Sequence, residues 1–185
     1  MAKLTVEEIC KRFETSKEFN EIFDAFEQAI EQGIDDMDVY IRLFWNQTLS
    51  PDELCFFGEQ LPKEYPSLAY NVYLWLATVF EATYSMFDNH ELALHYFQKA
   101  AEKRPNAPEP YLEAAECYER DLNIPPITTL IDFLRKGTEH VTPPTSLYER
   151  LITLYEIAGN DEMTAYYRRK LNPPYTPTQY PPATP

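Results

Sequence analysis

Histidine and cysteine are the side chains of this chain that could bind a metal ion or supply a nucleophile. His90 and His95 are five positions apart, and a helix would place them on different faces, because a helical metal pair needs a spacing of about four. The cysteines at positions 10, 55 and 117 are far apart, so neither a zinc site nor a disulfide framework is expected. We therefore predict no metal site and no cofactor, and we expect buried structural thiols.

Carboxylates are abundant, with 30 aspartates and glutamates against 16 lysines and arginines. Adjacent pairs such as Glu7-Glu8 and Asp35-Asp36 are typical of solvated helix faces and caps, and they do not indicate an acid–base pair. No cysteine, histidine and carboxylate form the pattern of an activated nucleophile. The four glycines do not form a phosphate-binding loop. The residues therefore nominate no catalytic group, and we predict that the chain is not an enzyme.

The net charge of −14 and the isoelectric point near 4.6 restrict the partners. Nucleic acids and anionic membrane surfaces both require a basic protein face. The sequence has no run of about 18 apolar residues, so no membrane-spanning helix is expected. The acidic start, Met1 to Glu8, does not match a signal peptide. We expect a cytoplasmic protein whose partners are neither nucleic acid nor membrane.

The residues between positions 93 and 105 show how the chain is built. Small Ala93, large Phe97 and small Ala100 have spacings of four and three, which place them on one face of a helix that Pro105 ends. Small residues let a neighbouring helix approach closely, and the large one fills the space beside it. This stretch predicts a helix that packs against its neighbours.

A second pattern recurs in the helices expected before and after such stretches. An aromatic residue is followed by an apolar residue three positions on, a small residue next, and a further aromatic three positions later. Three segments follow this order, the last with a large Ile152 at the small position: Tyr73, Leu76, Ala77 and Phe80; Tyr111, Ala114, Ala115 and Tyr118; Tyr148, Leu151, Ile152 and Tyr155. Matching second helices carry Leu54, Gly58 and Leu61, or Leu130, Leu134 and Gly137.

These two alternating patterns resemble the tetratricopeptide repeat (TPR) family, whose unit is a pair of antiparallel helices with a period of about 34 residues. The resemblance implies an all-α fold, a right-handed α-α superhelix of about four helix pairs. It spans residues 1–172, with a lone helix in 17–35 and repeat units at 36–69, 70–106, 107–143 and 144–172. Residues 173–185 contain six of the 16 prolines, and an extended tail is expected there.

Two units exceed the family period. The interval from Tyr73 to Tyr111 is 38 residues and that from Tyr111 to Tyr148 is 37, an excess of about one helical turn in each. We expect one extra turn near residues 82–85 and another around residues 123–125.

The resemblance also implies a concave groove lined by the first helix of each unit. The groove positions would be Trp45, Asn71, Leu74, Thr78, Glu109, Leu112, Glu116, Glu149 and Thr153, with Glu81, Glu119 and Glu156 one turn further along. TPR proteins that clamp acidic chaperone peptides carry Lys, Arg and Asn at such positions. Here glutamate and threonine replace them, so we expect a partner peptide or helix with basic and apolar side chains.

The function predicted from these residues is a non-enzymatic protein-interaction module or adaptor. The first alternative is a structural, self-associating component of a larger assembly, because aromatic residues collect at both ends: Phe19, Phe23 and Phe26 near one and Tyr166 and Tyr167 near the other. A homo-oligomer is possible on that hypothesis. The second alternative is a dedicated chaperone for a secreted protein.

Overall fold

The computed structural model describes residues 3–83 and 89–172, and these residues form helices joined by short connections. The helices are α1 (Val6–Thr15), α2 (Phe19–Glu31), α3 (Met37–Phe44), α4 (Pro51–Glu64), the 3₁₀ turn η1 (Pro66–Leu68), α5 (Ala69–Thr83), α6 (Asn89–Lys103), α7 (Glu109–Glu116), α8 (Ile127–Gly137), α9 (Thr145–Ile157) and α10 (Asp161–Leu171). The expected all-α solenoid of helix pairs is confirmed. The Pro-rich tail predicted at 173–185 lies outside the described residues.

Local sequence signals fix several helix ends. Thr5 and Ser50 each accept a hydrogen bond from a backbone N–H, and Glu8 and Glu53 bond back to the cap, so both helix starts are capping boxes. Gly33 and Gly159 have φ values of +71° and +68°, which glycine adopts without steric cost. After Gly33, the N–H of Ile34 donates to the carbonyl of Ala29 at 3.1 Å, the 6→1 bond of a Schellman motif.

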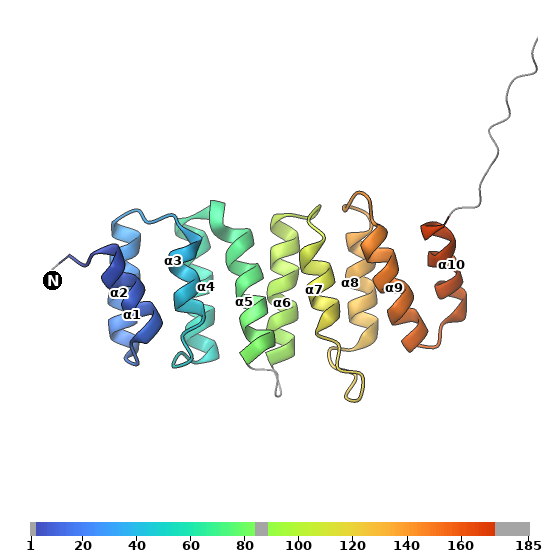
Figure 1. The fold of residues 1–185 in the computed structure, drawn as a ribbon, viewed down its shortest axis with the longest axis horizontal. Helices are drawn as coiled ribbons and strands as arrows, with labels where there is room; N and C mark the ends of the chain where they lie inside the picture. Colours follow the sequence, from blue (N-terminus) through green and yellow to red (C-terminus); the bar gives the residue numbers. More distant parts are fainter. Residues whose placement is uncertain (1–2, 84–88, 173–185) are drawn as a thin grey trace, which may run out of the picture.

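The helices form an elongated double layer (Figure 1). Odd-numbered helices contact one another at α1–α3, α3–α5 and α7–α9, and the pairs α1–α2, α5–α6, α7–α8 and α9–α10 pack along the chain. In Figure 1, α2, α4 and α8 lie behind α1, α3 and α7. Successive pairs are joined by α4–α5, α6–α7 and α8–α9 contacts. Contacts therefore join helices one or two places apart in the chain, as in a repeat protein.

The small residues of the second helices lie where neighbouring helices approach most closely. Ala93, Phe97 and Ala100 have no solvent-exposed surface. A Cβ added at Gly58 would lie 1.9 Å from Cδ1 of Leu76, and one added at Gly137 would lie 2.8 Å from the ring of Tyr111. These positions require small residues because side chains of the odd-numbered helices occupy the space, those of α5 at Gly58 and those of α7 and α9 at Gly137. They explain why the helices stack.

The helix expected to stand alone in 17–35 has a partner. Helix α1 precedes α2 and packs against both α2 and α3, and its Ile9 and Phe13 are fully buried. Asn46, only 4% exposed, donates hydrogen bonds to the carbonyls of Phe13 (2.8 Å) and Ser16 (3.0 Å). This amide fixes the C-terminal end of α1 to the loop after α3. Because α1 packs against α2, these two helices form the first pair.

The extra turn expected around residues 123–125 is not helical. Helix α7 ends at Glu116, and a loop with an isolated backbone bridge between Glu119 and Ile124 follows it. Asn123 has a φ of +51°, a conformation that asparagine tolerates, and two prolines follow that lack the N–H a helix interior needs. Tyr118, expected on the helix, lies in this loop and donates to Oδ1 of Asn123 at 3.2 Å. The other expected extra turn, at 82–85, falls partly outside the described residues.

Candidate functional site

The predicted groove residues lie on or directly beside the odd-numbered helices and reach solvent. We call the set the odd-helix surface. Its half-buried members are Asn71, Leu74, Thr78 and Leu112, and its exposed members are Trp45, Glu109, Glu116, Glu149 and Thr153. Spacings of three, four and seven keep the members of each helix on one face. Trp45 is the C-cap residue of α3 and is 38% exposed, so it lies at the helix end.

One end of the junction between α5 and α7 is closed by a polar cluster. The hydroxyl of Tyr70 donates to Glu109 at 3.4 Å, and the guanidinium of Arg104 lies 3.9 Å from the centre of the Tyr70 ring. Burial, followed by the Glu109 carboxylate, raises the pKa of Tyr70 to about 12. Glu109 is therefore a partner of Tyr70 as well as a surface carboxylate.

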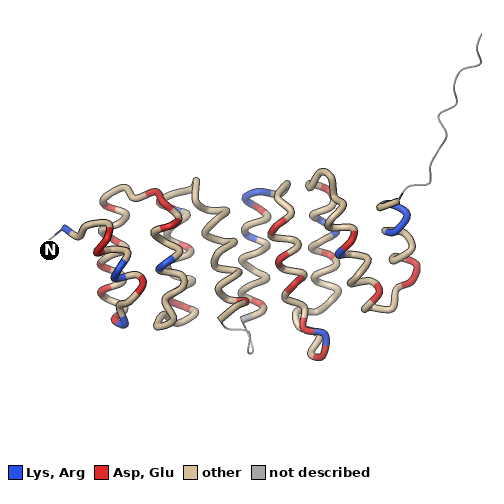
Figure 2. Tube along the Cα trace, viewed as in Figure 1, with Lys and Arg blue, Asp and Glu red and all other residues tan. Residues whose placement is uncertain are grey.

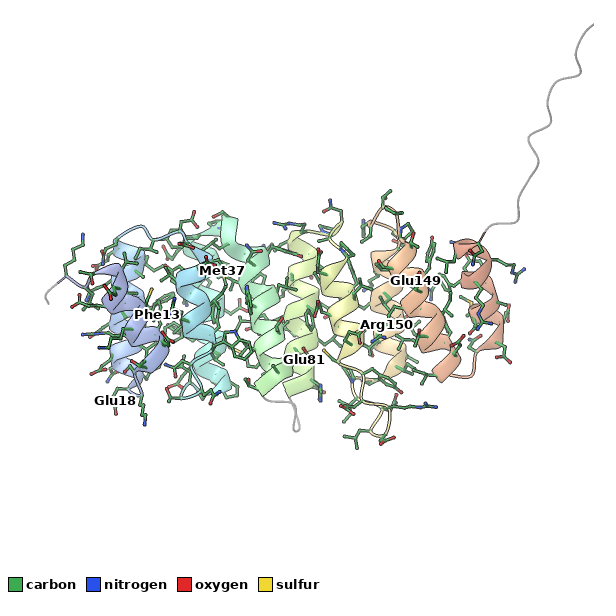
Figure 3. All side chains as sticks on the ribbon, in the orientation of Figure 1. Phe13, Glu18, Met37, Glu81, Glu149 and Arg150 are labelled. Atoms are coloured by element: carbon green, nitrogen blue, oxygen red, sulfur yellow. The ribbon has the colours of Figure 1, made fainter. Side chains whose placement is uncertain are left out.

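At the junction between α7 and α9, an arginine compensates the negative charge of a glutamate. Arg150 donates a hydrogen bond to the carbonyl oxygen of Ala115 at 2.8 Å and lies 2.8 Å from Glu116. Figure 3 places Arg150 and Glu149 next to each other on α9. The structure thus pairs one predicted residue, Glu116, with a cation that sequence reasoning did not nominate.

At the other end of the α5–α7 junction, carboxylates from the two helices interact electrostatically. Burial raises the pKa of Glu81, the carboxylates of Glu113 and Glu116 raise it further, and His90 opposes them. Within residues 3–83 and 89–172, no ion pair involves Glu81, Glu113 or Glu149. Figure 3 places Glu81 towards the C-terminal end of α5. Unneutralised negative charge therefore collects between α5 and α7.

The repeat register provides a signal for the residues that sequence reasoning missed. Counting two positions after the first aromatic of each unit gives Trp75, Glu113 and Arg150. Arg150 of α9 donates a hydrogen bond to the backbone of α7. In the same way, Glu113 of α7 interacts electrostatically with Glu81 of α5. A comparison of equivalent positions could have found both residues, whereas the helical periodicity of one segment could not.

Two surface hollows lie away from the odd-helix surface. A hollow of about 540 Å³ lies between α6 and α8, with Phe133 and His140 among its lining residues. A hollow of about 300 Å³ lies between α2 and α4, beside Phe23 and Phe56. Neither is lined by residues of the odd-helix surface.

The groups considered for chemistry are dispersed. Among residues 3–83 and 89–172, no cluster of histidine, cysteine, aspartate and glutamate has the arrangement needed for a metal ion. Cys117 is buried, and burial raises its thiol pKa to about 12. Cys10 and Cys55 are only half-buried, which corrects the expectation of three buried thiols. No helix in the described residues has the length and apolar composition to cross a membrane.

The aromatic residues at the two ends are more covered than the self-association hypothesis expected. Phe26 and Tyr167 are each 5% exposed, whereas Tyr166 is 42% exposed. Phe23 packs against Phe56 of α4, with ring centres 5.9 Å apart. Figure 2 shows basic residues gathered at the end of α10, and Arg168, Arg169 and Lys170 occupy that last turn. The C-terminal end is therefore partly polar.

The chain is similar in structure to two solved proteins. One is a thermophilic TPR protein of Thermus thermophilus, with 16% sequence identity, a TM-score of 0.48 and coverage of 83% of this chain and 81% of the other. The other is the MamA protein, with 16% identity, a TM-score of 0.47 and coverage of 90% and 87%. No protein-family model matches the sequence, and no curated protein matches it.

Proposed function

We propose that this chain is a non-enzymatic interaction module that holds a basic and apolar segment of a partner protein on the odd-helix surface. The observation that carries the proposal is the composition of this surface. Apolar Leu74 and Leu112 are half-buried at equivalent positions of α5 and α7, and Glu149 lies beside them in the array without an ion pair among the described residues. Opposite charge steers and orients a partner, and half-exposed apolar groups contribute contact area.

The solenoid suits such a partner because it presents equivalent positions along one face. Repeat arrays use extended surfaces of this kind, and a bound segment can contact several units at once. Figure 2 shows acidic residues recurring along α7. A basic segment lying across α5, α7 and α9 would meet both leucines and several carboxylates.

Charge reversal on the surface tests the proposal. The variant Glu109→Lys with Glu149→Lys alters two exposed positions of the odd-helix surface and leaves the Arg150–Glu116 pair in place. A matched control, Glu102→Lys with Glu139→Lys, makes the same change in net charge at exposed positions on α6 and after α8. Both variants should retain the helical circular dichroism of the parent chain.

Affinity capture from the native cell extract, followed by titration calorimetry with the purified captured protein, gives the measurement. We expect the control to bind like the parent and the odd-helix variant to bind about tenfold or more weakly, since two attractive charges become repulsive. Equal binding by the two variants would contradict the location of the surface. Failure of the parent chain to bind any protein directly would contradict the function itself.

A further inference from the structure

We propose that the junction between α5 and α7 is a subsite for one lysine or arginine side chain of the bound segment, held between the carboxylates of Glu81 and Glu113. The inference rests on the proposed function and adds to it the position and chemistry of one contact. It is carried by three observations: the contrast with the next junction, the packing of α5 and α7, and a buried imidazole beside the carboxylates.

The two successive junctions differ in one equivalent residue. Between α7 and α9 that position is Arg150, whose guanidinium bonds to the backbone and to Glu116 of the preceding helix. Between α5 and α7 the position is Glu113, whose carboxylate interacts electrostatically with Glu81. The first junction thus contains its own cation, and the second contains two like charges. A side chain from a partner can supply the charge that Arg150 supplies one repeat later.

The α5–α7 junction is also less closely packed than its neighbours. The odd-numbered helices contact one another at α1–α3, α3–α5 and α7–α9, whereas backbone contacts between α5 and α7 are sparser. Repulsion between ionised carboxylates disfavours close approach in this region. The carboxylates remain partly accessible, since Glu81 is half-buried and Glu113 is exposed.

His90 of α6 provides an observation that does not depend on the acidic residues. Its side chain is 6% exposed, and its Nδ1 atom has no hydrogen-bond partner among the described residues. The imidazole also interacts electrostatically with Glu81. Buried polar atoms in folded proteins are nearly always hydrogen-bonded. An unprotonated Nδ1 can accept a hydrogen bond from a guanidinium or ammonium group that enters beside Glu81.

An organic cation fits this site better than a metal ion. The described residues contain no cluster with a metal-binding arrangement, and the two carboxylates come from separate helices. A guanidinium carries five N–H donors in a planar fork and can bridge acceptors that are some distance apart. Lysine offers a compact charge with three donors. The site is therefore expected to prefer arginine over lysine and both over an uncharged side chain.

Matched peptides test the subsite without an identified partner. The probe is a short acetylated and amidated peptide with a central arginine between leucine and alanine residues, and its control carries citrulline, the uncharged isostere, at the centre. Binding to the full chain is followed by NMR of the glutamate side-chain carboxyl carbons. We expect the arginine peptide to shift the Glu81 and Glu113 signals and to bind about tenfold more tightly than the citrulline peptide.

Variants of the chain locate the effect. Glu113→Gln and Glu113→Arg should each abolish the preference for arginine, the second by supplying an internal cation. Glu102→Gln removes the same charge at an exposed position of α6, outside the odd-helix surface, and should leave the preference intact. Circular dichroism melting of each variant checks that the fold is retained.

Three results would overturn the subsite: no binding of the arginine peptide, equal binding of both peptides, or equal loss of the preference in Glu113→Gln and Glu102→Gln. Failure of the function is separate. If Glu109→Lys with Glu149→Lys abolishes binding of the captured protein but the peptides show no preference, the function stands and the subsite does not. If the peptides discriminate but partner binding ignores the odd-helix surface, the subsite stands without that function.

Discussion

Arg150 of α9 pairs with Glu116 of α7, the first helix of the preceding pair, at a distance of 2.8 Å. Its guanidinium also donates a hydrogen bond to the carbonyl oxygen of Ala115. Both acceptors belong to the end of α7, where unpaired backbone carbonyls favour a cation. The side chain of Arg150 has 24% of its surface exposed. The contact therefore contributes to the α7–α9 junction more than an exposed ion pair would.

Replacing Arg150 by methionine tests this contribution. Methionine retains much of the apolar stem but removes both contacts, so we expect the free energy of unfolding in urea to fall by about 1–2 kcal/mol. Arg135→Met is the control, because Arg135 is 56% exposed and lies 3.7 Å from Asp132, and a change within about 0.5 kcal/mol is expected there. Equal losses in the two variants would show that Arg150 is not a junction contact.

The stability of the chain should depend on pH through Glu81. Its folded-state pKa is raised, first by burial and then by Glu113 and Glu116, so the folded chain binds this proton more tightly than the unfolded chain does. Ionised Glu81 consequently lowers stability above the folded pKa, and this cost disappears as the pH falls towards the unfolded value. Glu81→Gln should therefore stabilise the chain at about pH 7.5.

The advantage of Glu81→Gln over the parent chain should shrink as the pH falls through the raised pKa towards the ordinary value of 4.5. Urea unfolding at a series of pH values measures the difference. Glu149→Gln, at an exposed position, controls for the loss of one negative charge. A stability gain of the same size at every pH would contradict the electrostatic explanation.

Gly137 should not tolerate even a methyl group. In an exposed helix, replacing glycine by alanine stabilises by up to about 1 kcal/mol. At Gly137 the added Cβ would lie 2.8 Å from the Tyr111 ring and 2.7 Å from Leu147, so we expect Gly137→Ala to destabilise by about 1–3 kcal/mol. Ala165→Gly at an exposed position of α10 measures helix propensity alone. Thermal unfolding shows whether Gly137→Ala stabilises or destabilises the chain. A stabilised variant would refute the packing argument.

The attachment of α1 should depend on Asn46. Asn46→Ala removes the side-chain donor to the carbonyl of Phe13, whereas the carbonyl of Ser16 still accepts from the hydroxyl of Thr48 at 3.2 Å. An unsatisfied buried group costs about 1–3 kcal/mol. Hydrogen exchange should show loss of protection in α1 before the rest of the chain. Ser67→Ala, which removes an exposed hydrogen bond to Asp35, should leave α1 protected. Unchanged protection of α1 in Asn46→Ala would mean that other contacts hold it.

Features carried by a single helix were predictable from the sequence. The spacing of Ala93, Phe97 and Ala100 defines one buried face whatever the helix packs against, and all three are buried in the structure. Gly58 and Gly137 were recognised by the same rule, because a small residue at a fixed position indicates close approach. The capping boxes of α1 and α4 are equally local.

Features that depend on how two segments meet were not predictable. Helix α1 was not recognised as the partner of α2 because its short sequence carries only Ile9 and Phe13 as fully buried side chains. The pairing of Arg150 with Glu116 depends on the register between two units. Tyr118 continued the apolar pattern of α7 into a segment that forms a loop, because Asn123 and the prolines after it favour a turn more strongly than one aromatic favours a helix.

The sparse contact between α5 and α7 has a mechanical consequence. In an array held together by neighbour contacts, stiffness is set at each junction separately. Here α6 still packs on α7 and joins the two halves of the array, whereas α5 and α7 contact each other only sparsely. Bending of the rod should therefore concentrate between α5 and α7, and the curvature that a bound segment encounters would change there first. A charge placed between Glu81 and Glu113 would act as a brace that stiffens the two halves into one body.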